Sequence, residues 1–206
     1  MPVVVTGYIP LPCSHRPRDA YEQLGARLLA ACPQAVSFRS TLDCCWLYDE
    51  LQRRGHDVEP GGKDTAAYHC VQHQKTAWIA AAEATLPDRT IVWIDYGILH
   101  LPGVTVDHVA AFLDAVDRQP PTLITAPSCG LFDVGDYLVN WTFCGGVLVV
   151  PAYHARWFHL ECVAERRGKL PTWEVNTWAD IRRRYPERFR LYRADHNETL
   201  FTGYPC

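Results

Sequence analysis

The stretch TIVWIDYGILHL, from Thr90 to Leu101, carries the strongest structural signal in the chain. Its run Ile91–Ile94 is apolar, β-branched and aromatic without interruption, the pattern of a strand buried on both faces of a mostly parallel sheet. Asp95 ends this run, and a carboxylate at the carboxyl end of such a strand opens into the crevice where α/β sheets bind ligands. The alternative is that Asp95 only begins a turn with Gly97.

Strand and helix patterns alternate on both sides of this central strand. The predicted strands are Val3–Thr6, Ala35–Phe38, Thr122–Ala126, Gly145–Val150 and Arg190–Tyr192. The predicted helices are Arg18–Ala31, Leu42–Arg54, Thr65–Thr85, Val106–Val116, Pro151–Gly168 and Trp173–Arg184. This alternation indicates a single-domain α/β/α sandwich with a mostly parallel central sheet.

Composition narrows the class of function. The 206 residues suit one domain, and the 48% hydrophobic and 21% charged residues are typical of a globular protein. The net charge is −3, and no block of Lys and Arg interleaves with aromatic residues. The chain therefore lacks the electrostatic signature of a nucleic-acid-binding protein.

The first residues and the cysteines indicate the compartment. The start, MPVVVTGYIPLPC, has no basic region before its apolar residues and soon meets Gly7 and Pro10, which predicts neither a signal peptide nor a transmembrane anchor. We expect a cytoplasmic protein whose nine cysteines are reduced and mostly buried. The stretch His69-Cys70-x-x-His73 offers three zinc ligands, but no second pair follows at zinc-site spacing, so structural zinc is not favoured.

Four polar segments stand at predicted strand ends, in loops or on a helix: Thr6-Gly7-Tyr8, Lys75, Trp93-Ile94-Asp95-Tyr96-Gly97 and Asp195-His196-Asn197. A diphosphate leaving group needs a cation to neutralise it, and one carboxylate with one imidazole can hold a hard divalent ion for this purpose. Asp95 and His196 are the candidate ligands, although an Asx turn is the competing explanation for His196. Lys75 could add its own charge on the phosphate.

Together these segments resemble the GT-A class of nucleotide-sugar glycosyltransferases. In that class a first strand of the form VVVT-x-Y meets the nucleotide, and a Lys-bearing helix precedes a strand that ends in an acidic metal-binding motif. The Trp-Ile-Asp-x-Gly form is most similar to the small HtrL-like bacterial enzymes. The chain departs from the usual Asp-x-Asp motif, because Asp95-Tyr96-Gly97 lacks the second carboxylate.

The resemblance implies that two parts of the chain bind different parts of the substrates. Residues 1–100 would form the nucleotide-binding part and residues 101–206 the donor-sugar and acceptor part. A nucleotide-sugar donor, UDP-linked, and Mn²⁺ or Mg²⁺ would be bound by Thr6, Gly7, Tyr8, Lys75, Asp95, Tyr96 and Gly97, with Asp95 and His196 as the metal ligands. The sugar and the acceptor would contact Asn140, Trp141, Gly145, Gly146 and Trp173.

Transfer with inversion needs a carboxylate as general base on the face opposite the departing diphosphate. Glu174 is the first candidate, because it begins a predicted helix between Trp173 and Trp178, whose indoles offer stacking faces for a sugar. Asp133 and Asp136, in a Gly-rich loop, are second choices. The competing explanation is that Glu174 is merely a favourable charge at a helix N-terminus.

The predicted function is a hexosyltransferase-type enzyme that moves a sugar to a carbohydrate or glycoconjugate acceptor. One alternative is a sugar nucleotidyltransferase, although Gly7-Tyr8-Ile9-Pro10 is a poor substitute for the Gly-rich phosphate loop of those enzymes. The other is a catalytically inactive nucleotide- or carbohydrate-binding module, which the single-Asp motif favours. The run Arg182-Arg183-Arg184 fits a solvated helix face, or peripheral contact with an anionic lipid or glycan surface.

Overall fold

The computed structural model of the protein describes residues 1–11, 17–56, 58, 64–130 and 139–205. The strands of these residues form one sheet in the order β2-β1-β3-β5-β4-β6. The strands are β1 (Val3–Tyr8), β2 (Val36–Arg39), β3 (Ile91–Ile94), β4 (Ile124–Ser128), β5 (Val147–Val150) and β6 (Phe189–Arg193). Neighbouring strands are parallel except where β5 pairs with β3 and β4. The predicted single-domain α/β class with a mostly parallel sheet is confirmed.

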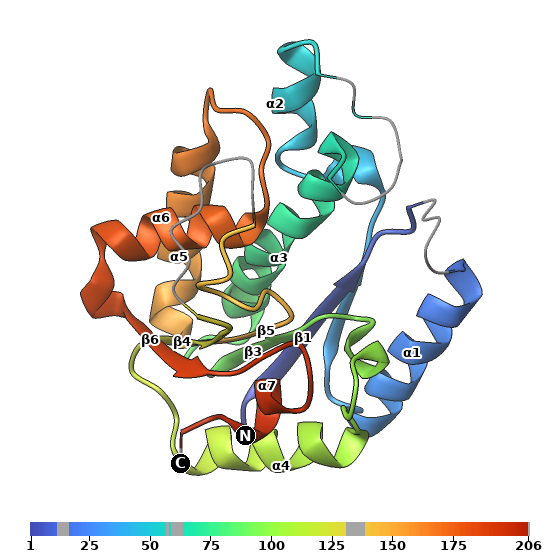
Figure 1. Cartoon of the computed structure of the whole chain (residues 1–206), viewed down its shortest axis with the longest axis vertical. Coiled ribbons are helices and arrows are strands. Elements are labelled where there is room, and N and C mark those ends of the chain that lie inside the picture. The colour runs from blue at the N-terminus through green and yellow to red at the C-terminus, as the bar shows by residue number, and fades with distance from the viewer. Residues whose placement is uncertain (12–16, 57, 59–63, 131–138, 206) are drawn as a thin grey trace.

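Helices cover both faces of the sheet (Figure 1). They are α1 (Arg18–Ala31), α2 (Tyr48–Arg53), α3 (Ala66–Thr85), α4 (Val106–Arg118), α5 (Ala152–Arg166), α6 (Glu174–Arg184) and α7 (Thr199–Thr202). Successive strand residues point to opposite faces, so Val3 and Val5 enter a core with α2, α3, α5 and α6, whereas Val4 enters a core with α1, α4 and α7. The result is the predicted three-layer sandwich.

The predicted helix Leu42–Arg54 is wrong in its middle. The chain forms a 3₁₀ turn at Leu42–Cys44, becomes extended at Cys45 and starts α2 only at Tyr48. Trp46 explains the break, because its backbone N–H donates to Gln74 and its indole N–H donates to the carbonyl of His73, both on α3. These tertiary contacts outweigh the local helix propensity.

The direction of β5 shapes one edge of the sheet. Because β5 is antiparallel to β3, with Ile94 opposite Val147, the amino end of β5 lies beside the carboxyl end of β3. The Asp95 N–H donates to the Gly146 carbonyl at 2.9 Å across this junction. The carboxyl ends of β1, β3, β4 and β6 therefore share an edge with the start of β5, and we call it the carboxyl edge.

The strand order also places a topological switch point between β1 and β3. From β1 the chain passes to β2 on one side, and it then crosses to β3 on the other side. Open α/β sheets bind ligands outside the carboxyl ends of the strands at such a point. Each helix in the described parts of the chain is too short or too polar to span a lipid bilayer.

Candidate active site

A buried lysine joins two carboxylates at the carboxyl edge. The Lys75 ammonium, on α3, lies 2.8 Å from Glu174 Oε1, 3.0 Å from Asp95 Oδ1 and 3.0 Å from the Gly145 carbonyl oxygen. Lys75 is only 3% exposed and Glu174 only 2%. We call Lys75, Asp95 and Glu174 the charge cluster, which unites three residues that separate sequence patterns predict as site residues.

The ammonium of Lys75 has a protein oxygen for each of its three hydrogens. Burial by itself lowers the pKa of Lys75, but the charges of Asp95 and Glu174 and their hydrogen bonds raise it more, so its pKa lies above the ordinary value. The side chain is therefore charged at neutral pH. Contact between Lys75 and a diphosphate stays a prediction, because its donors here point to Glu174, Asp95 and Gly145.

Asp95 is oriented by the strand that precedes it. The indole N–H of Trp93 donates to Asp95 Oδ1 at 2.7 Å, and Asp95 Oδ2 makes one long contact of 3.4 Å with Lys75. The Asp95 carbonyl also accepts from the Ile98 N–H, so the predicted turn through Gly97 forms as well. The Asp95 side chain is still 30% exposed, which leaves part of its carboxylate open to a ligand.

Glu174 begins α6, as the helix-N-terminal explanation requires, yet it is also part of the buried cluster. Its Oε2 atom is buried and has no hydrogen-bond partner among the described residues. A Cβ atom at position 145 would lie 2.4 Å from Glu174 Oε1, so only glycine leaves room for this carboxylate. An unpaired buried oxygen costs about 1–3 kcal/mol, so among the described residues this atom is a candidate to accept a hydrogen bond from a ligand.

Aromatic rings fill the switch point between β1 and β3. The Tyr8 ring stacks on Tyr96 with centroids 4.9 Å apart and on Tyr21 of α1 at 5.5 Å. The Arg39 guanidinium lies 5.5 Å from the Tyr8 centroid. Tyr8 and Tyr96 are mostly buried against these neighbours, and their predicted contact with a nucleotide stays a prediction.

Thr6, Gly7 and Gly97 have structural roles where they lie. Thr6 is fully buried in β1, and its hydroxyl has no partner among the described residues. A Cβ at Gly7 would lie 2.2 Å from the Trp78 ring, and one at Gly97 would lie 2.6 Å from the Tyr21 ring. Close packing therefore accounts for both glycines, and their nucleotide contacts stay predictions.

Trp173 lies directly before Glu174 at the end of the charge cluster. Its indole N–H donates to Asp64 Oδ1 at 2.6 Å, and its ring meets Tyr68 edge-on with centroids 5.3 Å apart. His69 lies 6.0 Å from the same ring, and burial lowers its pKa. These contacts hold the Trp173 ring in place directly before Glu174 in the chain. An aromatic ring of this kind can stack against a sugar.

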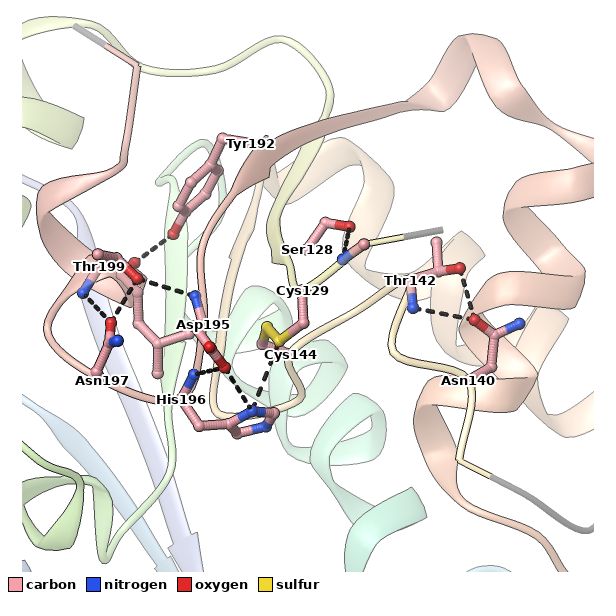
Figure 2. Close-up of a disulfide and its surroundings, with 12 residues drawn as sticks. Ser128, Cys129, Asn140, Thr142, Cys144, Tyr192, Asp195, His196, Asn197 and Thr199 are labelled. Atoms are coloured by element: carbon pink, nitrogen blue, oxygen red, sulfur yellow. Dashed lines mark hydrogen bonds and ion pairs between the residues drawn. A yellow bond between two sulfur atoms is a disulfide. The ribbon is translucent and has the colours of Figure 1, made fainter. Parts of the chain in front are cut away.

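The remaining predicted contacts lie near a disulfide. Asn140 Oδ1 accepts from the N–H and the hydroxyl of Thr142, as Figure 2 shows. The Trp141 ring packs edge-on against His196 with centroids 4.7 Å apart. Gly146 lies closer to the charge cluster, because a Cβ there would be 3.8 Å from Asp95 Oδ2. Asp133 and Asp136 fall outside the described residues.

His196 faces sulfur and not Asp95. Its Nδ1 atom lies 3.5 Å from Cys129 Sγ and 3.6 Å from Asp195 Oδ1. The Asp195 carboxylate also accepts from the His196 N–H, and the predicted Asx turn is present at Asn197, whose Oδ1 accepts from the Thr199 N–H. Within the described ranges no hydrogen bond or ion pair joins His196 to Asp95. Metal binding by this pair stays a prediction.

The cysteines partly differ from expectation. Cys129 and Cys144 form a disulfide, so the prediction of reduced thiols is wrong for these two residues. The free cysteines of the described chain are Cys32, Cys44, Cys45, Cys70 and Cys162, of which only Cys44 is exposed. In the stretch His69-Cys70-x-x-His73, burial and the charge of Arg166 lower the pKa of His73 to about 3, and His73 Nε2 donates to the Thr172 carbonyl.

Sequence reasoning missed three contacts. The Trp93 bond to Asp95 has a signal, because residues two apart on a strand point to the same side. The place of Tyr21 in the aromatic stack depends on how α1 packs, and the pairing of Cys129 with Cys144 depends on the direction of β5. Neither could be obtained from residue spacing.

By sequence, the chain matches no family model and no curated protein. Its structure, however, matches the crystal structure of a glycosyltransferase involved in the glycosylation of the major capsid of PBCV-1, with a TM-score of 0.55. The chain therefore shares the fold of that glycosyltransferase. The match has 10% sequence identity and covers 93% of this chain and 81% of that one.

Two further solved structures are similar at a lower level. They are mouse xyloside xylosyltransferase 1 in its apo form (TM-score 0.46, 11% identity, 92% of this chain and 84% of that one) and the apo-form glycosyltransferase GlyE of Streptococcus pneumoniae TIGR4 (0.44, 12%, 92% and 44%). At such low identities the comparison concerns the fold alone.

Proposed function

We propose that this protein is a GT-A-type glycosyltransferase that moves a sugar from a nucleotide diphosphate to a carbohydrate or glycoconjugate acceptor. The observation that carries the proposal is the buried, unpaired Oε2 atom of Glu174 at the carboxyl edge of a glycosyltransferase fold. Ligands bind at this edge in α/β proteins, and a buried carboxylate oxygen needs a partner. The form Trp-Ile-Asp-x-Gly at residues 93–97 resembles that of the small HtrL-like enzymes, and the sugar of the proposed transfer is a hexose.

Glu174 is the proposed general base. Lys75 holds Oε1, and the missing Cβ of Gly145 leaves room for the carboxylate, so Oε2 remains to take the proton of the acceptor hydroxyl. The oxygen of that hydroxyl bonds to the anomeric carbon while the bond to the diphosphate breaks on the opposite face. This geometry gives inversion of configuration, and a retained configuration in the product would contradict the role of Glu174.

Asp95 and His196 are the proposed ligands of Mn²⁺ or Mg²⁺. They fit a hard cation for two reasons. The Oδ2 atom of the partly exposed Asp95 makes only one long hydrogen bond, and the His196 side chain is 40% exposed. A bound ion would supply positive charge to the departing diphosphate. Tyr8 and Tyr96 then lie at the switch point, where a UDP-linked donor would place its nucleotide.

A donor screen tests the proposal. The purified chain is incubated with a panel of nucleotide sugars and manganese, and release of the nucleoside diphosphate is measured. We expect hydrolysis of one donor class, lost in Asp95→Ala and unchanged in Asp114→Ala, which alters an exposed position on α4. Diphosphate binding with no hydrolysis of any donor indicates an inactive binding module. Synthesis of a nucleotide sugar from a sugar phosphate indicates a nucleotidyltransferase.

The metal ligands have a test of their own. His196→Ala removes one of few protein ligands, so the manganese concentration at half-maximal activity should rise by about tenfold or more. His108→Ala, on α4, is the matched control and should leave the titration unchanged. Identical manganese titrations for the two variants would show that His196 is not a ligand of the ion.

A further inference from the structure

Three residues with soft ligand atoms converge at the carboxyl edge. The Sγ atoms of Cys129 and Cys144 and a ring nitrogen of His196 all lie within 4.8 Å of one another. Cys129 follows β4, Cys144 precedes β5 and His196 follows β6, as Figure 2 shows. We call these three residues the sulfur cluster. It shares no residue with the charge cluster.

One separation in the sulfur cluster matches that of two ligands on a tetrahedral zinc ion. Thiolate sulfur and imidazole nitrogen are the ligands that zinc prefers, at about 2.3 Å and 2.0 Å from the metal. Two such ligands at a tetrahedral angle lie roughly 3.5 Å apart. Cys129 Sγ and His196 Nδ1 are separated by 3.5 Å, so these two atoms already have the spacing of two zinc ligands.

Backbone hydrogen bonds hold the three segments together independently of the disulfide. The Cys144 N–H donates to the Pro127 carbonyl at 2.9 Å, and the Cys129 N–H donates to the Trp141 carbonyl at 3.2 Å. The Ala194 N–H donates to the Ser128 carbonyl at 2.9 Å, which ties the end of β6 to the end of β4. The two thiols therefore stay adjacent to each other and to His196 after reduction.

The surroundings suit an ion that enters from solvent. Cys144 is fully buried, whereas Cys129 is partly buried and the His196 side chain is 40% exposed. The Trp141 ring packs against the imidazole and keeps Nδ1 directed at Cys129. A site with three protein ligands and one open side is the arrangement that leaves a fourth position for water or a substrate atom.

We propose that Cys129, Cys144 and His196 form a zinc site when the disulfide is reduced. A dithiol supplies two electrons and two protons, the S–S bond breaks, and the dithiol becomes a disulfide. Zn²⁺ then displaces the two thiol protons and binds two thiolates and the neutral Nδ1 atom. This inference needs no part of the proposed glycosyl transfer. One consequence connects them, because an imidazole that binds zinc through Nδ1 carries its proton on Nε2 and cannot also hold manganese.

Zinc titration of the oxidised and the reduced protein tests the inference. The full chain is treated with a dithiol, desalted without oxygen and titrated with Zn²⁺ against a chromogenic chelator. We expect one tightly bound ion per chain after reduction and affinity at least about tenfold weaker in the oxidised protein. Co²⁺ in place of zinc should give the intense visible absorption of a tetrahedral thiolate site.

Matched variants decide which residues bind the ion. Cys129→Ser, Cys144→Ser and His196→Ala should each weaken the binding of Zn²⁺ at least about tenfold. Cys44→Ser, at an exposed free thiol, and Cys70→Ser, in the other Cys/His stretch, should bind zinc like the parent. His196→Ala leaves the disulfide untouched at a partly exposed position, so it remains informative if a cysteine variant fails to fold.

Three results would overturn the inference. The first is a disulfide that resists the dithiol in the folded protein, shown by an unchanged thiol count. The second is a reduced protein that binds no stoichiometric zinc. The third is unchanged zinc affinity in His196→Ala. Each of these outcomes can occur in an active glycosyltransferase, and failure of the donor screen leaves the zinc result unaffected.

Discussion

The charge cluster and the sulfur cluster lie at the same edge of one sheet but bury polar atoms in different ways. In the charge cluster, the ammonium of Lys75 lies between the carboxylates of Asp95 and Glu174, and its removal leaves the buried charge of Glu174 uncompensated. In the sulfur cluster, the covalent bond between Cys129 and Cys144 removes two polar hydrogens altogether. The first arrangement suits a fixed catalytic geometry, and the second suits a change of state with redox conditions.

Lys75→Met should produce the largest effect on stability. It leaves the buried carboxylate of Glu174 and the partly exposed one of Asp95 without their cation, and breaking a buried ion pair costs about 3–5 kcal/mol. The measurement is the free energy of unfolding in urea. Lys169→Met is the control, because its ammonium also pairs with a glutamate but is 52% exposed, so its loss should stay below about 1 kcal/mol. Equal losses would show that the charge cluster is no more tightly coupled than a surface pair.

Acid should weaken the attachment of α3 to the segment before Glu174. His73, on α3, donates to the Thr172 carbonyl, and its pKa of about 3 lies below the unfolded value of about 6.5. The unfolded chain therefore binds a proton that the folded chain does not, and this stability is full above pH 6.5 and falls toward pH 3. The expected loss is about 2 kcal/mol between pH 6.5 and 4.5.

His73→Gln should flatten the dependence of unfolding free energy on pH across this range, whatever its effect at pH 7. His56→Gln makes the same chemical change after α2, away from the hydrogen bond between His73 and Thr172, and is the control that should keep the parent slope. Urea unfolding at several pH values measures both slopes. If the unfolding free energy of His73→Gln depends on pH as steeply as that of the parent, His73 is not the group that titrates.

Gly145→Ala should have a smaller effect, which comes from packing. The added Cβ would lie 2.4 Å from Glu174 Oε1, and overpacking of this kind costs about 2 kcal/mol. Combined with Glu174→Ala, the same change should cost about 1 kcal/mol less, because the clashing carboxylate is gone. A double-mutant cycle measured by urea unfolding gives this coupling. If the two losses of unfolding free energy are additive, Gly145 and Glu174 do not interact.

Much of the fold follows from sequence because apolar periodicity and helix breakers are local signals. The direction of β5 does not, since a strand with the run Val147–Val150 buried on both faces reads the same whichever way it runs. That direction has a direct consequence for the site. It places Cys144 at the edge where Cys129 ends β4, and the disulfide could not be predicted without it.

The charge cluster was only partly predictable. Asp95 and Glu174 were selected because one follows a buried strand and the other begins a helix between indoles. Their contact through Lys75 joins residues up to 99 positions apart and depends on how α3 packs against the sheet, which no local pattern contains. The same limit applies to Trp46, whose bonds to α3 interrupt a helix that propensity alone would continue.

The rate of sugar transfer by Glu174→Gln tests the central claim most directly. Glutamine keeps the shape of the side chain but cannot accept the acceptor proton, so transfer should fall by roughly two to four orders of magnitude while nucleotide affinity stays near that of the parent. Glu187→Gln makes the same chemical change at an exposed position and should leave both quantities unaltered. A Glu174→Gln rate within a fewfold of the parent would contradict the assignment of Glu174 as the base.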